Sequence, residues 1–240
     1  MTQGPPYSAP FLTTRWTRVC LAKADSEDGR RALADLCDAY YEPVVTYLNN
    51  ALRDADAARD MSHAFFAEML GGGTIHTADR QRGRFRSYLL GAVKHFVSRQ
   101  REIQSTLKRG AGHVAVSMDD DDVAEVQDGG VFSPDAAFDR QWALTMLERS
   151  LAALRSECES EGRVHFFDVV RPMLTGDAAY GDQGAAAAAC AMSLEAFRVA
   201  VHRMKKRLRQ CVKAEIAGTL DDASGVADEM QVLFDALSGK

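Results

Sequence analysis

Arginine and lysine side chains gather in two stretches of this 240-residue chain. The first runs from Arg80 to Gly110 and carries nine basic side chains against one acidic side chain, Glu102. The second runs from Arg198 to Lys213 and carries seven basic side chains and no acidic one. A solvated helix face usually interleaves both signs, whereas same-sign blocks of this size favour contact with a polyanion through its phosphates. We therefore treat both stretches as candidate nucleic-acid surfaces.

The overall charge of the chain opposes binding to a polyanion. The chain holds 29 basic and 34 acidic side chains, so its formal net charge is −5 and its pI is about 5.7. Eight of the acidic side chains, and no basic one, lie between Ser117 and Asp139. An acidic chain is expected to bind DNA weakly by itself, so a partner would have to position the basic faces.

Other kinds of site chemistry lack the spacing they need. The six histidines are too dispersed for a metal site, and the five cysteines contain no C-x-x-C pair, which favours reduced thiols. Gly71-Gly72-Gly73 lacks the Lys-Ser/Thr of a phosphate loop, and Asp119 to Asp122 lack the spaced ligands of a calcium loop. No assembly of nucleophile, base and orienting group is visible. We expect no enzyme, no cofactor and no metal.

The chain lacks the apolar segments that a membrane or secreted protein would need. No stretch approaches the ~20 apolar residues of a membrane span, and residues 1–10 do not resemble a secretory signal. We therefore expect a cytoplasmic protein without membrane contact.

Helical periodicity positions the first basic stretch. Apolar residues recur at spacings of three and four residues over 28–52, which predicts a helix that Pro43 should kink or break. A second helix should begin after Asp54 and stop at Gly71. A third helix is expected over 84–106. The acidic residues 113–134 are typical of a flexible linker, and helical periodicity resumes at Ser133-Pro134-Asp135. Strand signals are weak, so the sequence predicts an all-α fold of two helical domains.

The second basic stretch lies in a pattern of two short helices. An apolar segment over 164–174 stops at Gly176. A short Ala-rich helix is then expected over 184–191, followed by a tight turn and a helix over 194–209 with Ser193 as its N-cap. This is typical of a helix-turn-helix, whose second helix enters the major groove of DNA. A helical hairpin with a solvated basic face is the alternative for this segment.

Three motifs in this order resemble a bacterial RNA polymerase sigma factor of the extracytoplasmic-function type. Residues 60–70 (DMSHAFFAEML) are similar to region 2.2, residues 83–96 (GRFRSYLLGAVKHF) to region 2.3, and residues 192–203 (MSLEAFRVAVHR) to the region 4.2 recognition helix. The opening Thr13-Thr14-Arg15-Trp16 resembles a sub-group with a C-terminal extension. Family members usually have glycine where this chain has Ala191, and a left-handed backbone there would cost alanine on the order of 1 kcal/mol.

The resemblance implies roles for particular residues. Region 2.2 would bind the β′ clamp helices of core RNA polymerase through Asp60, His63, Phe66 and Glu68. The −10 element would be melted and read by Arg84, Arg86, Lys94, His95, Arg99 and Arg101. The −35 element would be read by Arg198, Val199, His202 and Arg203, with Lys205 and Lys206 on phosphates. The β subunit and an anti-sigma factor or other regulatory protein are further candidate partners.

The expected organisation follows from these motifs. Residues 1–112 would form a region 2-like domain, 113–134 the acidic linker, 135–217 a region 4-like helix-turn-helix domain, and 218–240 a C-terminal extension with an amphipathic helix. That helix would dock on either domain or regulate the protein, and one hypothesis is that it masks a basic face. The expected function is promoter recognition with core polymerase. The alternatives are a free-standing helix-turn-helix regulator and a helical adaptor that binds only proteins.

Overall fold

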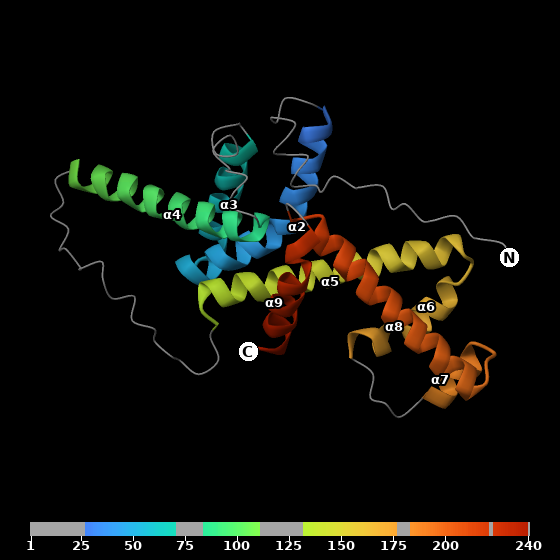
Figure 1. Ribbon diagram of the computed structural model, residues 1–240. Coiled ribbons are helices and arrows are strands. Elements are labelled where there is room, and N and C mark those ends of the chain that lie inside the picture. The colour runs from blue at the N-terminus through green and yellow to red at the C-terminus, as the bar shows by residue number, and fades with distance from the viewer. Residues whose placement is uncertain (1–26, 71–83, 111–131, 177–182, 221–222, 240) are drawn as a thin grey trace.

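The described part of the chain is helical throughout. The structure is a computed structural model and describes residues 27–70, 84–110, 132–176, 183–220 and 223–239 (Figure 1). Its elements are α2 (Glu27–Leu52), α3 (Ala55–Leu70), α4 (Phe85–Gly110), α5 (Pro134–Ser160), α6 (Val164–Thr175), α7 (Gln183–Ala189), α8 (Leu194–Ala217), the short 3-10 helix η4 (Ala223–Gly225) and α9 (Val226–Ser238). The predicted all-α fold is confirmed for these residues, which contain one isolated β-bridge, between Arg84 and Leu220, and no strand.

The first helices begin and end where local signals place them. Helix α2 continues through Pro43 instead of breaking there. It ends at a turn in which Arg53 has a positive φ of 55°. The Asp54 carboxylate then accepts the backbone N–H groups of Asp56 and Ala57, each at 3.0 Å, and so caps the start of α3 as predicted.

Helix α5 runs through the middle of the molecule and joins its two ends (Figure 1). The Ser133 hydroxyl accepts the N–H of Ala136 and Pro134 occupies the first turn, as the sequence indicates. Helix α5 packs on α2 and α9, and also on α6 and α8. The indole N–H of the buried Trp142 donates to the Tyr40 hydroxyl of α2 at 3.1 Å. Helix α5 therefore contacts α2 of the predicted region 2-like part and α6 and α8 of the predicted region 4-like part.

The buried side chains form one continuous core from α2 to α9. Tyr40, Phe85 and Trp142 are fully buried where α2, α4 and α5 meet. The helix expected in 218–240 is present as α9, and Met230 and Leu233 are its buried apolar side chains. The division into two domains stays a prediction, and most of the expected linker, residues 111–131, lies outside the described residues.

The last helices follow the predicted pattern with two differences. Helix α7 spans Gln183–Ala189, whereas the sequence predicts 184–191. Helix α6 ends at Gly176, whose φ of 85° is left-handed. Helix α8 continues to Ala217, eight residues beyond the expected end at Arg209. Cys211, Val212 and Ile216 are buried there. Their apolar spacing continues the inward face of α8, which explains the longer helix.

Candidate nucleic-acid interface

Helices α7 and α8 form a tight helix-turn-helix unit. The two helices bend by 91° relative to each other, which is the crossing expected of this motif. Ala191 occupies the turn with a φ of 52°. The next residue, Met192, donates its N–H to the Ala187 carbonyl at 2.9 Å, and the Ser193 hydroxyl accepts the N–H of Ala196 at 3.2 Å. The turn is thus closed by hydrogen bonds on both sides, and the predicted Ser193 cap is confirmed.

Buried side chains fix which face of α8 points outward. Phe197 is fully buried and packs edge-to-face on Phe166 of α6, with ring centroids 6.0 Å apart. Met204 and Leu208 continue the buried stripe. The opposite face presents all the residues predicted for the −35 element as exposed side chains: Arg198, Val199, His202, Arg203, Lys205 and Lys206.

The basic residues of α8 differ in their local partners. Arg198 donates from Nε to Oε1 of Gln183 at 3.0 Å. Arg207 donates to both carboxylate oxygens of Glu157, at 2.6 and 2.7 Å, and these hydrogen bonds hold the pKa of Glu157 below its usual value. Within the described ranges, no acidic side chain lies within ion-pair distance of Arg203 or Lys206. Those two cations can therefore meet an external phosphate or base edge.

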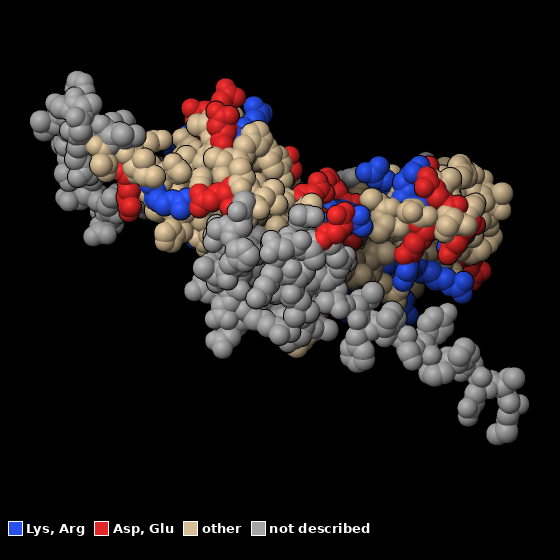
Figure 2. Space-filling view, turned by 90° about the horizontal axis from the view of Figure 1, so that it is seen from above, with Lys and Arg blue, Asp and Glu red and all other residues tan. Residues whose placement is uncertain are grey.

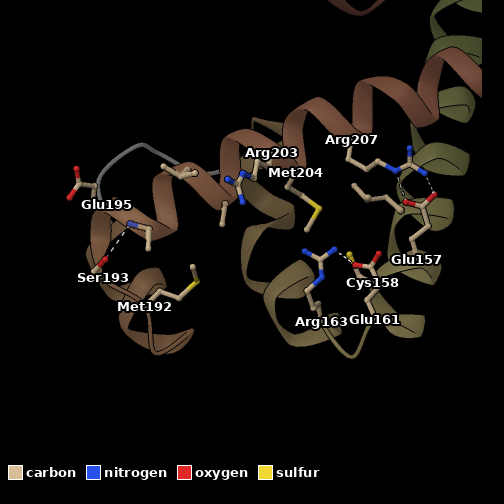
Figure 3. A pocket seen from close by; sticks show the side chains of 14 residues that line it. Glu157, Cys158, Glu161, Arg163, Met192, Ser193, Glu195, Arg203, Met204 and Arg207 are labelled. Carbon is tan, nitrogen blue, oxygen red and sulfur yellow. Dashed lines mark hydrogen bonds and ion pairs between the residues drawn. The ribbon is translucent and has the colours of Figure 1, made fainter. Parts of the chain in front are cut away.

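A groove of about 860 Å³ lies beside the exposed face of α8. Its walls come from the end of α5, the turn before α6 and the first turns of α8. Figure 3 shows Met192 and Met204 directed into it, with the ion pairs of Arg207 and Arg163 along its edge. The groove mixes thioether and charged groups, and Arg203 is shared between the groove and the outward face.

The six residues predicted for the −10 element lie at or along α4, but they are in different environments. His95 and Arg101 are exposed. Lys94 donates to Asp135 of α5 at 2.5 Å. Arg99 pairs with Glu68 of α3 and lies over the Phe96 ring. On the face drawn in Figure 2, acidic and basic side chains of the described residues are interspersed.

The remaining two, Arg84 and Arg86, pair with carboxylates of other helices, and Arg86 is largely buried. Arg86 is only 11% exposed in its side chain and is paired with Glu229 of α9 and Asp139 of α5. Its guanidinium also lies 5.1 Å from the centre of the Trp142 ring. Burial works to lower the pKa of Arg86, but hydrogen bonding and charge attraction from Glu229 and Asp139 outweigh burial and leave the pKa raised. Arg86 is therefore a firmly held cation in this arrangement.

The face predicted to bind polymerase lies on α3. Asp60, His63 and Glu68 are exposed, whereas Phe66 is buried with its ring 5.3 Å from that of Phe65. The hydroxyl of Tyr41 forms a 2.8 Å hydrogen bond with Nε2 of His63, and the two rings stack. Tyr41 is a neighbour that the sequence did not single out.

Sequence reasoning also missed the acidic partners of the α4 cations. Glu229 is 1% exposed although it is charged. A signal for it was present, because Glu229 lies on the same helical face as the apolar residues Val226, Met230 and Leu233. A carboxylate on an apolar face predicts a buried cation partner.

Comparisons with protein-family models, with curated proteins and with solved structures found no match to this chain. Within the described ranges, no group of three or more histidine, cysteine or acidic side chains is placed to hold a metal ion. No single described helix is long and apolar enough to span a bilayer; only α7 and α8 together, with their 91° bend, pass that test by length and composition.

Proposed function

We propose that this protein is a sigma factor, which binds core RNA polymerase and directs it to promoters through −10 and −35 DNA contacts. Its three motifs resemble sigma regions in the family's order, and helices carry all three. The basic residues of α8 point outward, and the acidic residues of the chain account for its low pI. The polymerase would then position DNA-contacting faces that bind weakly by themselves.

One observation carries the proposal: a capped turn and a 91° bend present the α8 cations on a single exposed face. A major groove admits one such helix, and arginine can pair there with guanine. Arg203 is the side chain best placed for this role, because it is exposed and has no acidic partner among the described residues.

Co-elution with bacterial core RNA polymerase on a sizing column is the first test. A one-to-one complex is expected. Separation of the two at low and moderate salt would contradict the sigma proposal.

A second test addresses α8 directly. Duplex DNA that the polymerase complex selects from a randomised library should bind Arg203→Ala more weakly by ~1–3 kcal/mol, with the loss confined to one base position. The matched control is Arg171→Ala, an exposed arginine of α6, which should change binding little. An equal loss on all DNA sequences would show that Arg203 contacts phosphate only.

A free-standing helix-turn-helix regulator is the second candidate. The observation that favours it is the contrast between α8, whose predicted DNA face is exposed, and α4, whose cations pair largely within the chain. Specific duplex binding by α8 without polymerase, together with no polymerase complex, would establish this alternative.

A further inference from the structure

Most of the cations predicted to bind the −10 DNA already hold carboxylates of the same chain. Arg84 donates to Oδ2 of Asp228 at 2.9 Å and to Oε1 of Glu229 at 3.0 Å. Arg86 donates from Nε to Oε2 of Glu229 at 3.0 Å and also pairs with Asp139. These carboxylates belong to α5 and α9, which lie side by side (Figure 1).

Lys94 extends the same arrangement by one more pair, with Asp135. Four acidic residues thus face the start and middle of α4, and we call them the acidic strip: Asp135 and Asp139 of α5, and Asp228 and Glu229 of α9. Each contact is the charge-assisted type that a phosphate would make with the same arginine or lysine. The strip and DNA therefore compete for the same donors.

Backbone contacts hold the C-terminal segment against α4. Phe85 donates its N–H to the Thr219 carbonyl at 3.3 Å, and Arg84 forms a β-bridge with Leu220. Leu220, Met230 and Leu233 are buried in the common core. The pairs of Glu229 with Arg84 and Arg86 are therefore part of a packed interface, whereas isolated surface ion pairs commonly contribute little.

The buried position of Glu229 links the release of Arg86 to a movement of α9. Its carboxylate is removed from water and accepts hydrogen bonds from both Arg84 and Arg86. If Arg86 turned to DNA while α9 stayed in place, Glu229 would remain as a buried, poorly compensated charge. Release of Arg86 to a phosphate thus requires that α9 also move away from α4.

We propose that the acidic strip is a built-in competitor of DNA for the α4 cations, and that its α9 part, Asp228 and Glu229, covers Arg84 and Arg86 until α9 is displaced. This inference rests on the proposed function, because it assigns the covered cations to promoter DNA. It also identifies which face the C-terminal helix masks: the start of α4, and not the exposed face of α8.

The test uses the full chain and the double variant Asp135→Asn/Asp228→Asn. Both carboxylates are about half exposed or more, at 49% and 71%, so the variant should fold. A labelled single-stranded oligonucleotide at low salt should bind the variant about tenfold more tightly than the wild type, because Lys94 loses its carboxylate partner and the loss of the Arg84–Asp228 pair makes α9 easier to displace.

The matched control is Glu148→Gln/Asp235→Asn. It also changes one acid on α5 and one on α9, with the same change in net charge, but neither residue is in the acidic strip. Its affinity should rise much less. Adding Arg84→Gln and Lys94→Gln to the first double variant should abolish the gain. Equal gains in the two double variants, or a gain that survives loss of both cations, would overturn the inference.

Two further measurements separate this inference from the proposed function. Hydrogen exchange at residues 219–238 should accelerate when the oligonucleotide binds, and unchanged protection in the DNA-bound chain would overturn the displacement of α9. Failure of every sample to co-elute with core polymerase would refute the sigma proposal alone, while a variant-specific gain in DNA affinity would still support the strip. A polymerase complex without that gain would refute the strip alone.

Discussion

At the scale of single residues, backbone strain falls at turns that orient the candidate interfaces. Arg53 and Ala191 are the non-glycine residues with positive φ in the described chain, at 55° and 52°. Each lies between two helices whose axes it redirects. Side chains other than glycine, asparagine and aspartate occupy this region at a cost of roughly 1–2 kcal/mol, so both turns are held by the packing of the helices around them.

Replacement of Ala191 by glycine should therefore stabilise the protein. We expect Ala191→Gly to raise the free energy of unfolding by up to about 1 kcal/mol, because relief of strain exceeds the added entropy of the unfolded chain. Urea unfolding would measure the change. Ala188→Gly is the matched control, since Ala188 is exposed and helical, and should destabilise by about 0.5–1 kcal/mol. Destabilisation by both substitutions would contradict the strained geometry at Ala191.

The Glu157–Arg207 pair makes the stability of the fold depend on pH. Hydrogen bonds from Arg207 lower the pKa of Glu157 below its ordinary 4.5. A carboxyl with a lowered pKa stabilises the fold at pH above that ordinary value, and this contribution disappears as the pH falls through the lowered pKa.

Glu157→Gln should therefore destabilise the protein at pH 7 by at most about 1 kcal/mol, since the pair is partly exposed. The difference from the wild type should shrink as the pH falls below 4.5. Urea titrations across this range would measure it, with the exposed Glu148→Gln as control. A difference that is constant with pH would show that the charge of Glu157 contributes nothing.

At the scale of elements, a buried polar centre joins α2, α5 and the turn that follows α8. The Tyr40 hydroxyl accepts from the Trp142 indole N–H and is hydrogen-bonded to Thr219, and burial raises the pKa of Tyr40 well above its usual range. All three residues are buried. Such a centre aligns the helices in one register, because a shifted packing would leave buried polar groups without partners.

Tyr40→Phe should destabilise the protein by about 1–3 kcal/mol, because the buried indole N–H of Trp142 loses its acceptor. Tyr41→Phe is the control on the next residue, where the exposed hydroxyl bonds to His63, and it should cost less than about 0.5 kcal/mol. Thermal unfolding of the two variants would compare them. Equal effects would argue against the buried centre as the element that joins these helices.

At the scale of the whole molecule, α9 is an integral part of the core. Met230 and Leu233 belong to the same buried cluster as α2 and α5. The segment expected to be a C-terminal extension therefore helps to hold both groups of motifs together. The acidic strip and this apolar contact are two aspects of one interface.

Leu233→Ala should accordingly lower the stability of the whole molecule, by about 2–5 kcal/mol. Far-UV circular dichroism and tryptophan fluorescence should report the same shifted midpoint, as one cooperative unit requires. The adjacent Phe234→Ala is the control, because Phe234 is 45% exposed and should cost much less. An unchanged midpoint for Leu233→Ala would mean that α9 is a separate appendage.

The helical class and most helix boundaries could be predicted from the amino-acid sequence alone. Asp54, Ser133 and Ser193 cap helices where expected, and Gly176 ends one in the left-handed region. These signals could be read without a structure because a cap is a contact between residues two or three apart. The outward face of α8 was predictable for a similar reason, since helical periodicity alone separates Phe197 and Met204 from the basic side chains.

The pairing of charges, in contrast, depends on how the helices pack. Arg84 and Arg86 belong to a basic stretch and resemble DNA-binding residues, yet they hold Glu229, which is 145 and 143 positions away in the chain. No local pattern encodes that pairing. It depends on how α5 and α9 pack against α2 and α4, and the common apolar core sets that packing. The availability of a cation for DNA is therefore a property of the packed molecule, because burial and a nearby carboxylate outweigh its place in the sequence.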